Sequence, residues 1–188
     1  MKKLIILTIN VILLCSCVSI DYKYKWYTPS EIIKNKDSLN EGDILIVSKG
    51  STIGTMWGHV AIINKYKRIV DFPTYGVGYN EQSLSTLSNI KNMIAIFRLK
   101  DIDDKFKFEL DKEISNTKYK VYGLTFDKNF DKRLYCSQFV YIVFKNAGLN
   151  LGKSVDLDYN GGNWVMPFDI MYSPLLENIN LYTKKTSQ

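Results

Sequence analysis

The sequence predicts one α+β domain in which an antiparallel sheet packs against helices. In the first half of the chain, short apolar runs alternate with polar turns and a loop rich in Gly, Ser and Thr, a pattern typical of antiparallel strands. In the second half, apolar residues recur at helical spacing. The chain contains no internal repeat and no low-complexity segment. A single domain therefore accounts for the part that folds.

The first half is expected to open with a helix at Thr28. Thr28 can cap this helix, Pro29 suits its first position, and Glu31 completes a capping box. After the turn at Gly42, strands are expected where apolar runs are bounded by turn residues. These strands are residues 44–47, 59–63, 68–72 and 93–99.

The second half is expected to hold two longer helices. Asp103 or Asp104 can cap the first, and its apolar positions follow at helical spacing: Phe106, Leu110 and Ile114. The second helix covers residues 136–147, with Gly148 where a helix C-terminus favours glycine. A loop and a last strand complete the prediction, at residues 119–132 and 179–183.

The N-terminus resembles a bacterial lipoprotein signal peptide. A basic start is followed by an apolar run that is too short to span a bilayer as a stable helix. The run ends in Leu14-Cys15-Ser16-Cys17, which resembles a lipobox. Cleavage before Cys17 would leave it as the acylated N-terminus, and several acyl chains anchor a protein stably. We therefore expect a signal peptide at 1–16, a lipidated tether at 17–27, a folded domain at 28–188, and attachment to a membrane of the bacterial cell envelope.

Charge argues against a nucleic-acid partner. The formal net charge of +6 falls to +4 once Lys2 and Lys3 leave with the signal peptide. The remaining lysines are scattered among aspartates and form no basic run, which indicates a solvated mixed surface. We expect a monomer.

Cysteine usage singles out Cys136. Cys15 leaves with the signal peptide and Cys17 carries the lipid, so Cys136 is the one thiol left and no intramolecular disulfide can form. An unpaired thiol in an exported protein is a candidate reactive group. The alternative is a small buried apolar residue.

His59 is the only possible imidazole partner for Cys136, because the chain contains one histidine. Cys136 lies at the expected start of a helix, where free N–H groups favour a thiolate and can stabilise an oxyanion. A thiolate also needs a proton partner, which is normally histidine. One His and one free Cys cannot fill a tetrahedral zinc shell without unusual carboxylates, so we expect neither a metal nor a cofactor.

Asp71 is the candidate that orients the imidazole. Residues 59–63 and 68–72 form a hairpin; if Ile63 pairs with Lys67, then His59 lies directly opposite Asp71, on the same face. A shift of one residue would separate the two side chains. The alternative is a surface acid near a strand end.

The segment Tyr135-Cys136-Ser137-Gln138-Phe139-Val140-Tyr141 resembles the nucleophile helix of NlpC-type, papain-like cell-wall peptidases. Here the histidine precedes the cysteine, an order similar to the circularly permuted branch, the YiiX-like amidases. The resemblance covers about residues 41–174. It implies a papain-like site with Cys136 as nucleophile, His59 as base and Asp71 as the third polar residue. That branch usually carries glutamate at the third position and a Cys-Ser-Glu motif, from which Asp71 and Gln138 depart.

Three aromatic residues are weaker candidates. Tyr122 resembles a tyrosine that the family places near the cysteine, where it could donate to the substrate, although a packed aromatic is an equal alternative. Trp57 and Trp164 could line a cleft, but aromatic residues lie in the core by default.

These features predict a membrane-anchored hydrolase that cleaves an amide bond through a thioester acyl-enzyme. The envelope location and the resemblance imply peptidoglycan stem peptides as substrate. Two alternatives remain open. One is a lecithin–retinol-type acyltransferase or phospholipase with the same Cys-His pair, and the other is a non-catalytic binding lipoprotein of the envelope.

Overall fold

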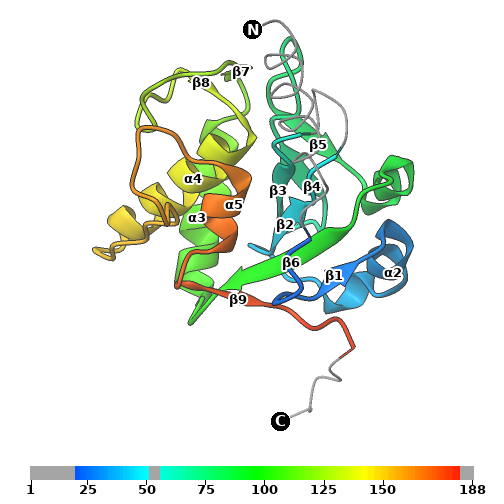
Figure 1. Cartoon of the computed structure of the whole chain (residues 1–188). Helices are drawn as coiled ribbons and strands as arrows, with labels where there is room; N and C mark the ends of the chain where they lie inside the picture. The colour runs from blue at the N-terminus through cyan, green and yellow to red at the C-terminus, as the bar shows by residue number, and fades with distance from the viewer. Residues whose placement is uncertain (1–19, 51–55, 183–188) are drawn as a thin grey trace, which may run out of the picture.

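The computed structural model describes residues 20–50 and 56–182. Its main feature is a seven-stranded antiparallel sheet in the order β1-β6-β2-β3-β4-β5, with β9 also paired to β6 (Figure 1). The strands are β1 (Trp26–Tyr27), β2 (Ile44–Val47), β3 (His59–Ile63), β4 (Ile69–Asp71), β5 (Asn80–Gln82), β6 (Ile94–Leu99) and β9 (Leu176–Asn178). The α+β class and the four strands expected from the sequence are confirmed.

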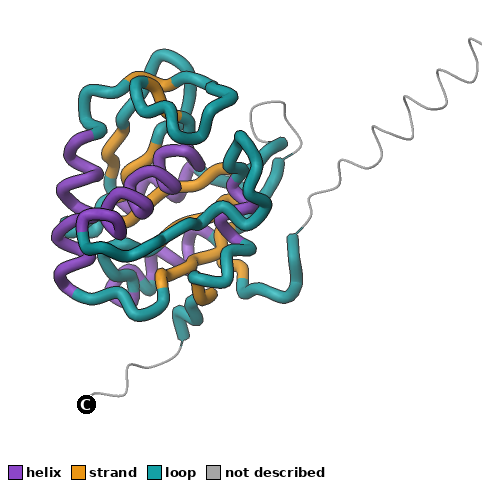
Figure 2. The backbone as a smooth tube through the Cα atoms, turned by 90° about the vertical axis from the view of Figure 1, so that its left-hand side faces the viewer, coloured by secondary structure: helices purple, strands orange, loops and turns teal. Residues whose placement is uncertain are grey.

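Helices cover both faces of this sheet. On one face lie α3 (Asp104–Asn116), α4 (Cys136–Asn150) and α5 (Pro167–Met171); on the other lie α2 (Pro29–Lys34) and the 3₁₀ turns η1 (Lys36–Ser38) and η2 (Leu84–Asn89). A small parallel pair, β7 (Val121–Tyr122) and β8 (Arg133–Leu134), stands apart from the main sheet. In Figure 2 the upper end of the molecule, where β7 and β8 lie, is made mostly of loops.

Alternation along the strands separates two cores. Ile44 and Ile46 face α3 and α4, while Leu45 between them faces α2 and η2. The central strands are therefore apolar on both sides, which is why they appear in the sequence as continuous runs of Ile, Leu and Val. The sheet is held rigid from both faces, and its strand ends provide fixed positions for polar side chains.

The predicted helix starts are confirmed. The Thr28 hydroxyl accepts from the backbone N–H of Glu31 at 3.3 Å, and the Glu31 carboxylate accepts from the N–H of Thr28 at 2.7 Å. Asp103 caps α3 through the N–H of Phe106 at 2.7 Å. Both caps satisfy N–H groups that the first helical turn leaves free.

The predicted end of α4 is wrong. Gly148 lies inside the helix, which runs on to Asn150, and the glycine with positive φ is Gly152. A Cβ at Gly148 would come within 2.7 Å of the Val155 side chain and 2.9 Å of the Lys153 carbonyl. The lack of a side chain at position 148 therefore lets Lys153 and Val155 pack closely against α4.

The chain ends also differ from prediction. The last strand is β9, which precedes the expected 179–183 segment; of that segment, Thr183 lies outside the described residues. At the other end, residues 26–27 pair with β6 although the sequence places them in the tether. The short β7 strand occupies part of the expected 119–132 loop. Each of these strands has only two or three residues, so none leaves a period of alternation in the sequence.

A buried ion pair fixes the entrance to β2. Asp43 is fully buried and accepts two hydrogen bonds from the Arg98 guanidinium, at 2.7 and 2.9 Å. It also accepts from the backbone N–H of Asn40 at 2.7 Å. Burial raises the pKa of Asp43, and the Arg98 hydrogen bonds act in the opposite direction. Without the guanidinium, the carboxylate would be left buried and uncompensated.

We therefore expect Arg98→Ala to lower the free energy of unfolding by about 3–5 kcal/mol, the usual cost of removing one partner of a buried ion pair. Arg68→Ala is the matched control, because Arg68 pairs with Glu81 at the surface and exposed pairs contribute at most about 1 kcal/mol. Urea titration of both variants measures the difference. Equal losses would contradict a special role for the Asp43–Arg98 pair.

Candidate active site

Cys136 is the first residue of α4 and lies against the start of β3. The backbone N–H groups of Val60 and Ser137 are close enough to its sulfur to favour the thiolate. Its side chain is partly exposed, and it is the only free cysteine among the residues that the structure describes. The nucleophile expected from the sequence is thus held at a helix N-terminus, beside a strand end and within reach of solvent.

The residues on either side of Cys136 fix the helix start. The Ser137 hydroxyl donates to the Val165 carbonyl at 2.7 Å, and the Tyr135 hydroxyl accepts from the N–H of Val165 at 3.1 Å. Both side chains are buried. The segment that leads into α5 is therefore bound to the start of α4, which leaves Cys136 little freedom to move.

His59 lies between the sulfur and a carboxylate. Its Nε2 is 2.8 Å from Asp71 Oδ2, and Cys136 lies close enough to the ring to act on its charge. Because Nε2 faces Asp71, Nδ1 is the nitrogen left to face the sulfur. Asp71 is only 5% exposed, so the hydrogen bond to the ring is shielded from water. The structure brings the three predicted residues together in a line.

The predicted hairpin register is wrong by two residues. Ile63 pairs with Ile69, not with Lys67. The turn is longer than expected because Lys67 takes a positive φ of 54° and Asn64 Oδ1 accepts from two backbone N–H groups. A shift of two preserves the face on which a side chain lies, so Asp71 reaches His59 diagonally.

Asn80 is the functional residue that the sequence analysis missed. Its amide donates to Asp71 Oδ1 at 2.8 Å, and it pairs with Asp71 across β4 and β5. One carboxylate oxygen of Asp71 therefore bonds His59, and the other accepts from Asn80. No sequence signal singles out Asn80, because β5 is polar throughout and lacks apolar alternation.

The electrostatics favour an ion pair between cysteine and histidine. Burial disfavours a charge on His59, but the hydrogen bonds to Asp71 and Cys136 outweigh it and raise the pKa of the imidazole. Burial likewise disfavours the Cys136 thiolate, but His59 and the N–H groups of Val60 and Ser137 outweigh it and lower the pKa of the thiol. The pair can therefore exist as thiolate and imidazolium, the reactive form.

The aromatic candidates occupy different positions. Tyr122 is half-buried and pairs with Leu134, two residues before Cys136; burial and the charge of Cys136 raise its pKa. Trp57 is 58% exposed, two residues before His59. Trp164 packs edge-to-face on Phe126, with ring centroids 4.9 Å apart. Neither tryptophan belongs to the core.

Gln138 has a structural role that a glutamate could not fill. Its amide nitrogen donates to the carbonyls of Asp127 and Phe130, at 3.2 and 2.7 Å, and a carboxylate has no such donor at neutral pH. Gln138 therefore ties the 124–132 loop to α4. Its Oε1 is buried without a hydrogen-bond partner within the described part of the chain.

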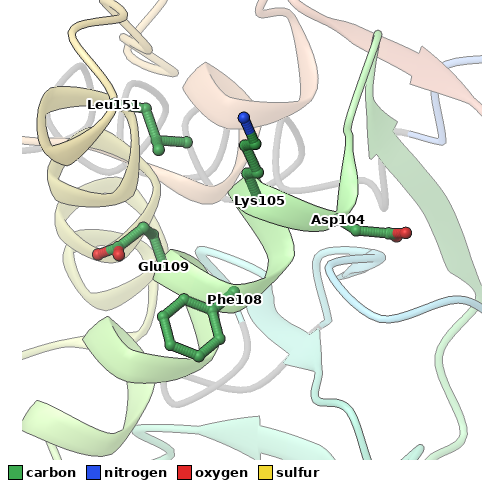
Figure 3. A pocket seen from close by; sticks show the side chains of 5 residues that line it. All are labelled: Asp104, Lys105, Phe108, Glu109 and Leu151. Carbon is green, nitrogen blue, oxygen red and sulfur yellow. The ribbon is translucent and has the colours of Figure 1, made fainter.

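The other possible sites are weaker. A hollow of about 360 Å³ beside α3 is lined by Asp104, Lys105, Phe108, Glu109 and Leu151 (Figure 3). It contains none of the side chains of Asp71, His59 and Cys136.

Among residues 20–50 and 56–182, no group of three or more His, Cys, Asp or Glu side chains could hold a metal ion. No helix in these same ranges is long and apolar enough to cross a membrane.

Comparisons with known proteins bear on the fold and the family. Residues 38–160 match the model of a family described as permuted papain-like amidase enzymes, YaeF/YiiX, C92 family. The fold resembles a crystal structure of the metalloprotein YiiX from Escherichia coli O157:H7, with a TM-score of 0.59 and 18% identity over 76% of this chain and 97% of that chain. A search of curated proteins found no match. The chain belongs to the permuted papain-like amidases of the YaeF/YiiX family.

Proposed function

We propose that this protein is a cysteine hydrolase that cleaves an amide bond through a thioester acyl-enzyme. The observation that carries the proposal is the continuous line from Asp71 through His59 to Cys136 at a helix N-terminus. A thiolate, a proton carrier and an orienting carboxylate are the groups that acyl transfer requires. The chain supplies all three without a cofactor.

The reaction would proceed in two halves. The Cys136 thiolate attacks the amide carbonyl and forms a C–S bond, while N–H groups of the first turn of α4 stabilise the oxyanion. His59 gives its proton to the leaving nitrogen as the C–N bond breaks. Water then attacks the thioester and gives a proton to His59. The C–S bond breaks, and the acid leaves with the thiolate and imidazolium restored.

Peptidoglycan stem peptides are the proposed substrate class, since a lipoprotein of the envelope would meet these amides. A second candidate is acyl transfer from a lipid through the same thioester. The large apolar side chain of Trp57, exposed two residues before His59, favours it. Mass spectrometry after incubation with purified peptidoglycan and, separately, with phospholipid vesicles distinguishes the two. No product from either substrate in wild type beyond that of Cys136→Ala would overturn the proposed activity.

Membrane attachment through Cys17 is part of the proposal, although Cys17 lies outside the described residues. The Leu14-Cys15-Ser16-Cys17 sequence supports it. Cys17→Ala should block processing or release the protein from the membrane fraction. A processed variant that stays firmly in the membrane fraction would refute a lipid anchor at this residue.

The lowered pKa of Cys136 predicts fast alkylation near neutral pH. A free thiol titrates at about 8.5, and iodoacetamide labelling of Cys136 should persist well below that pH. Labelling should slow at acid pH, because the thiolate is protonated. The activity, measured as kcat/KM, should fall at alkaline pH, above the ordinary range of histidine, because His59 loses its proton. In His59→Ala the pH profile of labelling should shift to higher pH. Cys136→Ser is the control that shows that the label attaches to Cys136. Identical profiles in wild type and His59→Ala would mean that His59 does not activate this thiol.

Asp71 should orient His59 rather than take part in covalent chemistry. Asp71→Asn should preserve the fold and lower kcat by up to about 10⁴-fold, the loss seen for the equivalent change in a Ser-His-Asp enzyme. The loss should be smaller than for Cys136→Ala, because an existing ion pair depends less on its third member. Asp71→Glu should retain more activity than Asp71→Asn. Wild-type turnover in Asp71→Asn would show that Asp71 does not orient His59. Asp169 on α5, another carboxylate that could be considered as the acceptor for His59, accepts instead from the Asn160 amide and the N–H of Met166.

Asn80→Ala should lower kcat by up to about 10²-fold, because a misplaced catalytic group is costly even when the change lies outside the reacting atoms. The alkaline limb of the kcat/KM profile should also move, since Asp71 would lose a fixed partner. Gln82→Ala, on the same strand, is the matched control and should behave as wild type. A loss of stability in Asn80→Ala without any change in the pH profile would indicate a purely structural role.

A further inference from the structure

Exposed apolar side chains lie on three segments that neighbour the catalytic pair in the sequence or in the fold. We call six of them the apolar rim: Trp57, Tyr75, Val77, Val121, Leu124 and Phe126. They are between 51% and 84% exposed. Their segments lie before β3, between β4 and β5, and around β7, at the end of the molecule where α4 begins (Figures 1 and 2). Exposed apolar side chains gathered on neighbouring segments are typical of an interaction site.

Contacts join the segments of the rim to one another and to the site. A Cβ at Gly78 would lie 2.8 Å from the Lys120 carbonyl and 3.3 Å from Val121 Cα, so the loop before β5 touches β7. The next residue of β7, Tyr122, pairs with Leu134, two residues before Cys136. Phe126 packs on Trp164. These contacts join the rim segments around β7 to one another and to the chain just before the nucleophile.

Contacts to buried side chains fix the part of the rim that follows β7. Lys128 pairs with the buried Asp158, while Gln138 bonds the carbonyls of Asp127 and Phe130. Leu124 and Phe126 are thus presented on an anchored loop, and their exposure is a fixed property of the fold. Docking through this loop would need little ordering, which lowers the entropic cost of binding.

The charge beside the rim is positive. Residues 118–133 contain five Lys or Arg and two Asp. Lys120 pairs with Asp131, and Lys128 pairs with Asp158 outside the segment. The exposed cations left over are Lys118, Lys132 and Arg133, against Asp127 alone. A surface that combines aromatic and aliphatic tips with basic side chains complements an anionic lipid interface.

We infer that the apolar rim docks on a lipid bilayer that contains anionic lipids, with the catalytic pair facing the membrane. The apolar side chains stand on separate loops and on the short strand β7, an arrangement suited to insertion among lipid headgroups, and the basic residues would lie at headgroup level. The inference rests on the proposed function only in placing that site at the membrane surface. Docking itself requires no turnover.

The test uses the positions of the three tryptophans. Trp57 lies in the rim and Trp164 packs beside it, whereas Trp26 is on β1 and donates its indole N–H to the Asp21 carbonyl. Full-length processed Cys136→Ala protein is mixed with vesicles of phosphatidylcholine and phosphatidylglycerol whose acyl chains carry bromine. We expect fluorescence quenching that Trp57→Phe with Trp164→Phe abolishes and that Trp26→Phe leaves intact.

Quenching reports orientation even where an N-terminal lipid already holds the protein on the vesicle. Lys132→Glu with Arg133→Glu should weaken rim quenching by roughly fivefold or more for each lost basic residue, and added salt should weaken it further. Quenching confined to Trp26, or none, would overturn the inference, as would equal quenching on pure phosphatidylcholine. Because the probe protein lacks Cys136, these outcomes stand apart from any failure to find hydrolysis.

Discussion

The contact between the start of α4 and the start of β3 is the constraint on which the site depends. It brings together Cys136 and His59, which lie far apart in the sequence, and it puts the Val60 N–H near enough to the sulfur to favour the thiolate. The two cores of the sheet fix the strand, and Tyr135 and Ser137 fix the helix start through Val165. The reactive groups themselves contribute little to this rigidity. The fold positions them, and their chemistry follows from the position.

The carboxylate in the site is buried, and hydrogen bonds compensate for its loss of water. Asp71 is almost fully buried, yet both of its oxygens are bonded, one to His59 and one to Asn80. An unpaired carboxylate at this depth would be strongly disfavoured. The same balance recurs at Asp43, where a guanidinium compensates the charge at the entrance to β2. The two carboxylates differ in what they hold: Asp43 secures backbone, whereas Asp71 secures a ring that must carry a proton.

Features set by residue scarcity or by local rules could be predicted from the sequence. One histidine and one unpaired thiol left a single possible pair, and the caps at Thr28 and Asp103 follow from the chemistry of a helix start. Features set by a tertiary contact could not be predicted. The hairpin register depends on the conformation of Lys67, and Asn80 acts through a strand too polar and short to show a period. Gly148 was assigned to a helix end although its small size serves the packing of Val155.

Strand β6 pairs with both β1 and β9, so the two ends of the described chain lie along the same strand. The backbone N–H of Lys25 donates to the Asn178 side chain at 2.7 Å, and Tyr27 accepts from the N–H of Leu181 at 3.0 Å. Ends that already touch need only a short connection to be joined, and the chain can then be opened elsewhere without altering the packing. This adjacency gives a physical route by which one architecture could exist in two orders of sequence, with the histidine before the cysteine or after it.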